Sequence, residues 1–376
     1  MSVVFNRSPD PTIGVELELQ IVDRETLDHL PVASVILDTL GHPPTVKHEL
    51  FECTIEITTG ICRTVAEARD DLERELARVT EICDDRGWLV LAAGSHPFAR
   101  WQDRVVSPNP RYRELIERVQ LPLRKLLIFG THVHIGVDHP EKAIAIQNAM
   151  RVFLPHFLSL SASSPYWMGE DSGMASSRSM IFDVMPTAGI PIELRNWGEF
   201  VRYISALRSS RAIESIREVW TDIRPHPDLG TVELRICDAM PTLSEVSAIA
   251  ALTQSLNAWL ARRYDEGAPL PRLSPWIIRE NKWRAARYGL EADLVIDDDG
   301  GLEPLLAGVR DLLRDLRPIA TDLGCAEELA SIGAIVERGP SYRRQREVFD
   351  RRKGLDDVVR SLVDELRTDV LTPAIS

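Results

Sequence analysis

The chain has 376 residues, a formal net charge of −13 at pH 7, 44% hydrophobic and 27% charged residues, and five cysteines that form no C-x-x-C pair. The acidic charge argues against nucleic acid as a partner, and the lack of any run of about 18 apolar residues argues against a membrane span. We therefore expect a globular, cytoplasmic protein with reduced thiols and a single domain over residues 1–376.

The first half of the chain is predicted to mix strands and helices. Residues 12–22 and 51–59 alternate apolar and polar side chains, as strands do, whereas residues 23–47 are expected to be an irregular connection. Thr64 and Glu67 fit a capping box that opens a helix to about residue 86. The next expected elements are a strand at 88–94, a loop at 96–111 followed by a helix, a strand at 126–137, and a helix over 141–161 that Pro155 should kink or divide.

The second half begins with a stretch of weak periodicity. Residues 162–200 are rich in Ser, Gly, Pro and Met, and we expect an ordered segment that covers a site. A strand at 231–237 precedes a capping box at Thr242 and a helix to about residue 264. From about residue 302 the chain is expected to be helical. Strands separated by helices, with alternating faces, predict an α+β fold with an antiparallel sheet and one polar face.

Three short segments each carry a polar pair at positions i and i+2 between apolar residues. Successive side chains on a strand point to opposite faces, so each pair would lie on one face. Carboxylates mixed with imidazoles indicate Mg²⁺ or Mn²⁺, and an added arginine indicates a phosphate partner, although the chain has no P-loop motif. The pairs are Glu16 and Glu18, His132 and His134, and Glu233 and Arg235.

Further carboxylates lie near the second predicted strand. Glu52 and Glu56 share a strand face, and Glu49 lies on the turn before them. Glu49 on the turn and Glu56 on the strand are seven residues apart and could bind one ion from two sides.

Simpler interpretations stand beside this one. Glu16 and Glu18 could be an exposed strand face, and Glu233 and Arg235 could neutralise each other. In the functional interpretation Glu233 binds a metal and Arg235 stabilises charge on a transferring phosphoryl group. Alternative functions are an ATP-dependent kinase of a small guanidino or carboxylate compound, a metallohydrolase, and a non-catalytic protein that binds metal or nucleotide.

Together these segments resemble the motifs of the carboxylate-amine ligases of the type 2 glutamate–cysteine ligase family. The resemblance covers roughly residues 12–290 and includes segments 14–18, 49–56, 130–134, 167–173, 222–225, 231–235 and 281–285. This family is part of the glutamine synthetase superfamily. The resemblance implies a glutamine synthetase-like fold, in which an antiparallel, funnel-shaped sheet flanked by helices holds two or three Mg²⁺ ions between ATP and glutamate.

The resemblance also implies two sets of metal ligands. One ion would be bound by Glu18, Glu49 and Glu56. A second ion, which bridges the ATP phosphates, would be bound by Glu16, His132 and Glu233.

Other residues would contact the substrates. The resemblance places His134 near the nucleotide and Arg235 at the transferred phosphate, with Arg178, Lys282 and Arg284 as anion-binding residues. The implied activity joins the γ-carboxylate of glutamate to an amine such as cysteine, through an acyl phosphate made with ATP. A homodimer or larger homo-oligomer is also implied.

Overall fold

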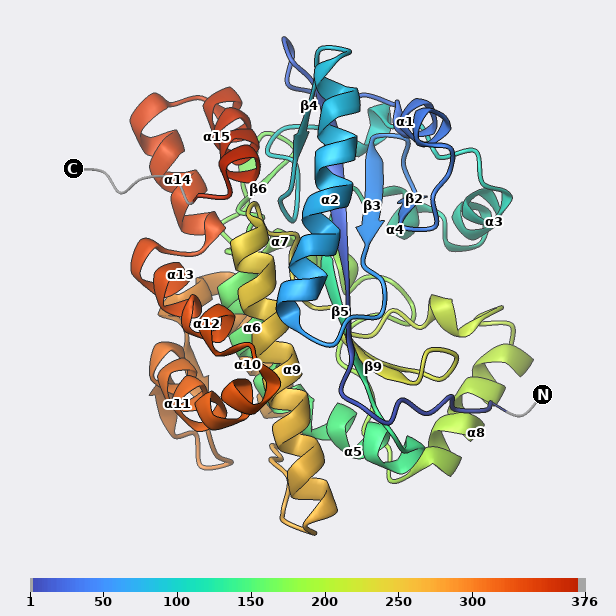
Figure 1. The fold of residues 1–376 in the computed structure, drawn as a ribbon, viewed down its shortest axis with the longest axis vertical. Helices are drawn as coiled ribbons and strands as arrows, with labels where there is room; N and C mark the ends of the chain where they lie inside the picture. Colours follow the sequence, from blue (N-terminus) through green and yellow to red (C-terminus); the bar gives the residue numbers. More distant parts are fainter. Residues whose placement is uncertain (1–2, 371–376) are drawn as a thin grey trace.

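The computed structural model describes residues 3–370, and a seven-stranded sheet lies at its centre (Figure 1). The strand order is β2-β3-β1-β5-β9-β8, with β4 paired to the far end of β1, and every pairing is antiparallel. The predicted antiparallel α+β architecture is therefore confirmed. The strands are β1 (Ile13–Asp23), β2 (Val46–His48), β3 (Thr54–Thr58), β4 (Trp88–Leu91), β5 (Thr131–Gly136), β8 (Ile223–His226) and β9 (Thr231–Leu234).

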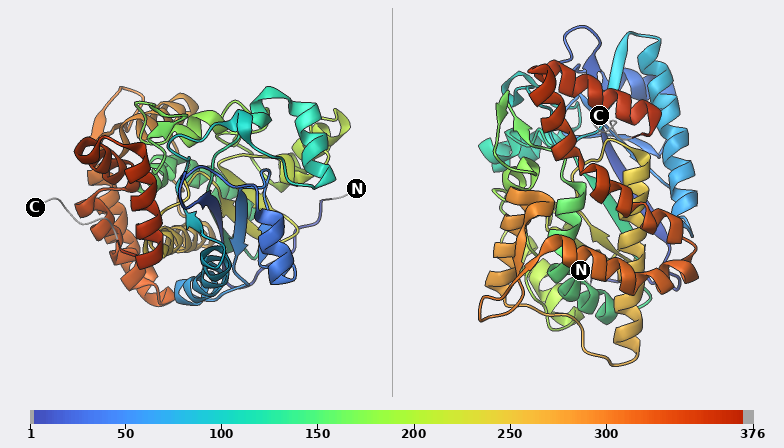
Figure 2. Two further views of the ribbon diagram at one scale, coloured as in Figure 1. Left: turned by 90° about the horizontal axis from the view of Figure 1, so that it is seen from above. Right: turned by 90° about the vertical axis from the view of Figure 1, so that its left-hand side faces the viewer.

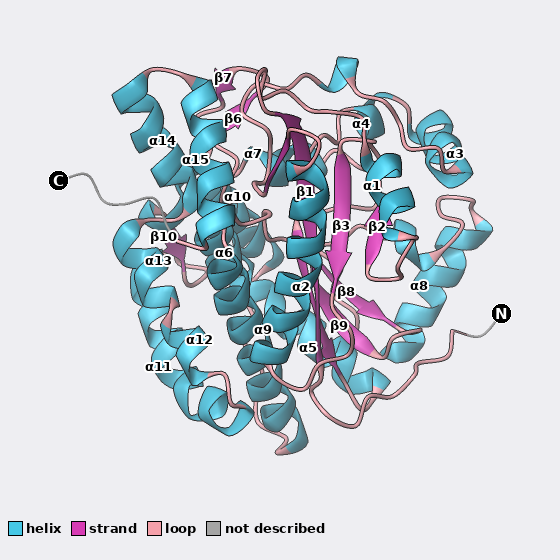
Figure 3. Ribbon diagram, turned by 45° about the horizontal axis from the view of Figure 1, so that its top comes forward, coloured by secondary structure: helices cyan, strands magenta, loops and turns pink. Residues whose placement is uncertain are grey.

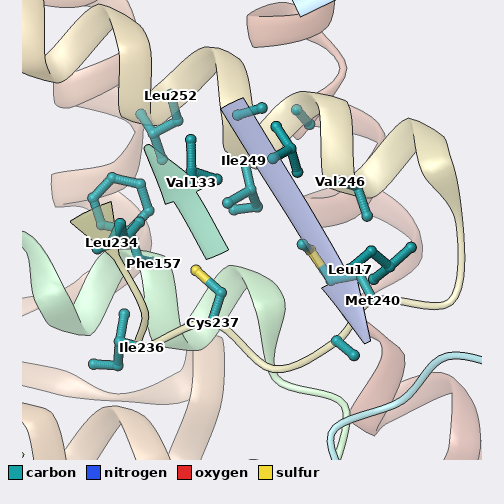
Figure 4. Packing of buried hydrophobic residues seen from close by; sticks show 14 of the residues in the cluster. Leu17, Val133, Phe157, Leu234, Ile236, Cys237, Met240, Val246, Ile249 and Leu252 are labelled. Atoms are coloured by element: carbon teal, nitrogen blue, oxygen red, sulfur yellow. The ribbon is translucent and has the colours of Figure 1, made fainter. Parts of the chain in front are cut away.

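One face of the sheet is apolar and is covered by helices α2 (Val65–Asp84) and α9 (Leu243–Asp265). Apolar side chains from β1, β5 and β9 meet α9 there, and their removal from water stabilises the packing of helix on sheet. Figure 4 shows this contact from close by, with Leu17, Val133 and Leu234 on the strands and Val246, Ile249 and Leu252 on α9.

The sequence signals for helix starts are confirmed. The Thr64 side chain accepts a hydrogen bond from the Glu67 amide (3.2 Å) and caps α2, and Thr242 caps α9 in the same way. The predicted division at Pro155 is also present. A short 3₁₀ turn separates α5 (Pro140–Met150) from α6 (Leu154–Ser161), and the proline lies in the first turn of α6, where its missing N–H costs nothing.

The expectation of an irregular connection at residues 23–47 was wrong, and the stretch of weak periodicity at 162–200 contains short elements. Residues 23–47 contain α1 (Ala33–Leu40) and β2, because a few buried apolar side chains and a left-handed Gly41 (φ 72°) suffice to define a short helix. Residues 162–200 contain β6 (Tyr166–Trp167), β7 (Glu170–Asp171) and α7 (Ser177–Phe182), and α8 (Trp197–Ser209) begins there. Elements this short carry too few residues for a periodic signal.

The C-terminal helices pack outside α6 and α9, on the side opposite α8 in Figure 3. Residues 302–304 are a strand, so the helical portion begins at Leu305 rather than at residue 302. None of the described helices has the length and apolarity needed to cross a bilayer. This region comprises α10 (Pro275–Tyr288), β10 (Asp293–Val295), β11 (Leu302–Pro304), α11 (Leu305–Leu323), α12 (Ala326–Ala330), α13 (Ile332–Arg338), α14 (Ser341–Arg352) and α15 (Leu355–Thr368).

The polar face of the sheet has its own cover. Helices α3 (Pro110–Val119) and α4 (Leu121–Arg124) lie on the opposite side of the strands from α2 (Figure 2). They share a small apolar cluster with Met185 and Trp220 that is separate from the main core. The cover therefore packs mainly through this small cluster, and Leu50 connects it to the main core.

Candidate active site

Strand register brings the three predicted polar pairs together on one face. Glu16 of β1 lies opposite His132 of β5, Glu18 lies opposite Glu56 of β3, and His134 lies opposite Glu233 of β9. Directly opposite side chains on antiparallel strands are neighbours, with Cβ atoms about 5 Å apart. Residues more than 200 positions apart in the sequence thus form one continuous polar surface.

The residues of this polar surface, except the fully buried Glu233, form the floor of a cavity of about 710 Å³. Its walls include Tyr112 and Leu115 of α3, Leu123 of α4, and Trp220 from the connection before β8. Residues 162–200 contribute Arg178 and Phe182 to the lining. A concave site of this size has the usual form of a ligand-binding site, and its many charged side chains suit a charged ligand.

The polar surface offers three groups of potential metal ligands, and within each group the ligand atoms lie within 4.8 Å of one another. The first expected set comes together as a group. The members of the second expected set are divided between two groups, because His134 rather than His132 is grouped with Glu233, and Glu16 belongs to both. The groups are Glu18, Glu49 and Glu56; Glu16, Glu56 and His132; and Glu16, His134 and Glu233.

Crowding of carboxylates raises the pKa values of two of these ligands. Burial and the charge of Glu16 raise the pKa of Glu56 to about 8, although Lys47 lies 3.2 Å away and lowers it in part. Burial together with the charges of Glu56 and Glu18 raises the pKa of Glu49 well above its ordinary value. A cation among these groups would remove the repulsion and favour their ionised forms.

The two histidines contact the same carboxylate in different ways. His132 Nδ1 lies 3.1 Å from Glu16 Oε2. His134 Nδ1 lies 3.1 Å from Thr231 Oγ1, which directs its Nε2 toward Glu16 (3.4 Å) and Glu233 (3.7 Å). Burial opposes ionisation of Glu16, but its contacts with His132 and His134 outweigh burial and hold the pKa of Glu16 well below its ordinary value.

This donor set fits a divalent cation. The His134 Nε2 atom is buried without a hydrogen-bond partner and faces two carboxylates. Neutral imidazole nitrogen and carboxylate oxygen are both metal ligands, and the contact of His134 Nδ1 with Thr231 is the kind of outer contact that fixes a ligand ring. Because carboxylates outnumber the histidines, the set suits Mg²⁺ or Mn²⁺ better than zinc.

Two arginines, the buried Arg224 and the partly exposed Arg235, flank Glu233 at the other end of the floor. Arg224 Nη2 lies 2.8 Å from Glu233 Oε2, and Arg235 Nη1 contacts Oε1. Burial raises the pKa of Glu233, but the charges of Arg224 and Arg235 outweigh this effect and hold it well below its ordinary value. Glu233 is therefore ionised, and it places two cationic side chains at the cavity, which both arginines line.

Sequence reasoning missed Arg224. Its segment, residues 222–225, was among the family-like motifs, and it carries the polar pair Asp222 and Arg224 around Ile223, the same signal that singled out the other strands. The register shows the place of Arg224, which lies directly opposite Glu233 on the neighbouring strand.

The three remaining predicted anion-binding residues lie in different places. Arg178 lines the cavity, donates hydrogen bonds to the main-chain oxygens of Arg235 and Ile236, and lies where any side chain at Gly130 would collide with it. Lys282 and Arg284 are not among the residues that line the cavity. Lys282 is buried between two aspartates, and Arg284 pairs with a glutamate one turn earlier in α10.

Comparison with known proteins gives consistent matches along the chain. The model of glutamate–cysteine ligase family 2 matches residues 12–365. A protein of Thermobifida fusca (strain YX), provisionally named glutamate–cysteine ligase 2, is 47% identical over 374 residues, which are 98% of this chain and 94% of that protein. A protein of Frankia alni, provisionally named glutamate–cysteine ligase 2-1, is 45% identical over 375 residues, which are 98% of each chain.

Solved structures share the fold at low sequence identity. The glutamate–cysteine ligase of Francisella tularensis in complex with AMP superposes with a TM-score of 0.68 at 13% identity, covering 97% of this chain and 90% of that chain. A bifunctional glutathione synthetase of Pasteurella multocida gives a TM-score of 0.61 at 14% identity, covering 96% of this chain and 52% of that chain. These likenesses confirm the predicted fold.

Proposed function

The chain belongs to glutamate–cysteine ligase family 2, and from this premise we propose the reaction that its cavity performs. The protein is an ATP-dependent carboxylate-amine ligase that activates the γ-carboxylate of glutamate and joins it to an amine, with cysteine as the first candidate. Family membership favours this ligase over the kinase. The observation that carries the proposal is one cavity floor with crowded carboxylates at one end and paired arginines at the other.

We propose that the three ligand groups hold Mg²⁺ or Mn²⁺. The ligands would be Glu16, Glu18, Glu49, Glu56, His132, His134 and Glu233. When bound, the cations supply charge that screens the phosphates of ATP from the carboxylates of the floor and of glutamate.

The arginines stabilise the charge that develops during phosphoryl transfer. Arg235 and Arg224 are held by Glu233 with their guanidinium groups at the cavity, so no reorganisation is needed when charge develops on the transferring group. The γ-phosphoryl group of ATP is transferred to an oxygen of the glutamate γ-carboxylate, and the bond from the γ-phosphorus to the bridging oxygen breaks so that ADP leaves. The amine nitrogen then attacks the acyl carbon, the bond from carbon to the phosphate oxygen breaks, and phosphate leaves as the amine loses a proton.

The apolar wall protects the acyl phosphate from hydrolysis. The side chains of α3 and α4, together with Trp220, form this wall above the charged floor. Exclusion of water at such a site prevents loss of a reactive intermediate and strengthens the interactions of its charged groups.

The direct test is phosphate release from Mg-ATP and glutamate, with and without a panel of amines that includes cysteine, followed by mass analysis of the products. The proposal expects release that depends on the amine and a new γ-glutamyl amide. A stable phosphorylated compound would instead support the kinase. Release that does not require glutamate would contradict the proposed carboxylate.

Magnesium is expected to stabilise the protein more at pH 8.5 than at pH 6. The pKa of Glu56 is raised to about 8, so metal-free stability is highest when this group is protonated and is lost as the pH rises from about 4.5 toward 8. Mg²⁺ requires the ionised form and relieves the repulsion. Thermal melting with and without Mg²⁺ at the two pH values measures the effect.

The matched control for this pH dependence is Glu56→Gln. It removes the titrating group and should make the magnesium-induced shift in melting temperature smaller and nearly independent of pH. A wild-type shift that is equal at both pH values would contradict the assignment of Glu56 as a ligand.

The homo-oligomer remains a prediction from the resemblance, and light scattering in solution would test it. The cytoplasmic location also remains a prediction.

A further inference from the structure

Lys282 is buried outside the cavity, in contact with two aspartates from other elements. It lies on α10 with 4% of its surface exposed, and its Nζ atom lies 2.7 Å from Asp183 Oδ1 and 2.8 Å from Asp222 Oδ2. Asp222 is 3% exposed. Placing such charges in the interior is costly, and an apolar replacement of a buried ion pair is often no less stable, so stability alone gives a weak reason for this arrangement.

The main chain of Asp222 is hydrogen-bonded to the main chain of Arg235. The Asp222 carbonyl oxygen accepts a hydrogen bond from the Arg235 amide (2.8 Å), and the Asp222 amide donates to Gly189 O (2.8 Å). Asp222 immediately precedes β8, which carries Arg224. The lysine thus fixes the residue that holds the backbone at Arg235, just beyond the end of β9.

The second partner of Lys282 lies at the end of α7. Asp183 is the C-terminal capping residue of this helix, and Arg178 of the same helix lines the cavity. Lys282 therefore joins the segments that carry three of the arginines that line the cavity, namely Arg178, Arg224 and Arg235.

We propose that Lys282 is a positioning residue for the ligase, which acts through Asp222 to hold Arg235 in the orientation required for phosphoryl transfer. This inference rests on the proposed function. It gives Lys282 a role other than direct contact with an anionic substrate, in accord with its position outside the cavity lining.

Lys282→Met is expected to lower kcat about 100-fold, with little change in the KM for Mg-ATP, since small displacements of a catalytic group carry costs of this size. The same pattern is expected for Arg235→Ala, because its partner is charge in the transition state. In the double variant the two losses should not multiply, because Lys282 acts through Arg235. Independent, multiplicative losses would overturn the proposal.

Lys142→Met is the matched control. Lys142 lies on α5, is 7% exposed, and likewise pairs with two aspartates, Asp138 and Asp265, away from the cavity. The Lys142→Met variant should melt at a lower temperature than the wild type but keep the wild-type kcat. If Lys282→Met does not fold, Asp183→Asn removes only one partner of Lys282 and should produce a smaller loss of kcat with the same pattern.

The orientation of Arg235 can also be read without turnover. The side-chain Nε–H signal of Arg235 in NMR, assigned by its loss in Arg235→Lys, should shift in Lys282→Met and not in Lys142→Met. An unchanged signal in Lys282→Met would overturn the positioning role. If the wild-type protein shows no turnover, the proposed function is contradicted. The NMR comparison would still test whether Lys282 positions Arg235.

Discussion

Replacing Glu16 with glutamine is expected to lower kcat roughly 100- to 1000-fold, the range seen when one preorganised electrostatic group is removed from an active site. Glu16 is the only residue common to the two ligand groups that contain a histidine. Glutamine keeps the size and one acceptor oxygen but lacks the charge that a cation requires. No other described carboxylate lies between His132 and His134 to replace it.

The fold of Glu16→Gln should be retained. About a quarter of the Glu16 side chain is exposed (24%), and its charge is one of the causes that raise the pKa of Glu56. Losing that charge lets the pKa of Glu56 fall, which offsets the weakened contacts with the histidines. We therefore expect the free energy of unfolding of the metal-free protein to change by less than about 1 kcal/mol, measured by urea denaturation.

Glu52→Gln is the control for this experiment. Glu52 is a buried carboxylate near the start of β3, but it accepts hydrogen bonds from the Ser34 amide and hydroxyl and belongs to none of the ligand groups. It should keep a kcat close to that of the wild type. If Glu16→Gln also kept the wild-type kcat, or if it unfolded, the result would support the interpretation of Glu16 as an ordinary strand residue.

Replacing Glu233 with glutamine is expected to remove both activity and stability. Glu233 is fully buried and is the counterion of Arg224 and Arg235. Removing one partner of a buried ion pair leaves uncompensated charge in the interior, at a cost of about 3–5 kcal/mol in the free energy of unfolding. Folded protein should also have lost most of its kcat, because the two arginines are no longer held at the cavity.

The comparison variant is Glu245→Gln. Glu245 of α9 is a buried glutamate that shares Arg344 with Glu365, far from the cavity lining. It should lose stability in urea denaturation but keep kcat at a temperature where it is folded. Equal activity of the two variants when folded would mean that Glu233 has only a structural role.

The sequence predicted the elements whose signals are local and long. The alternation over residues 12–22 became β1, and the capping boxes at Thr64 and Thr242 start α2 and α9, because a hydroxyl that accepts an amide hydrogen bond acts within one turn. Elements with only weak local signals were not predicted. Helix α1 and strand β2 were missed, since each buries only a few side chains.

The sequence by itself also determined which polar side chains share a strand face, because pairs at i and i+2 on a strand lie on one face whatever that strand pairs with. Which pair meets which neighbour was decided only by the tertiary structure. Register placed His134 opposite Glu233 and Arg224 on the other side of Glu233, and the packing of α10 placed Lys282 against Asp222, outside the cavity lining. Strand pairing joins residues far apart in the chain, so their distances and shared charges depend on the packed sheet and not on sequence spacing.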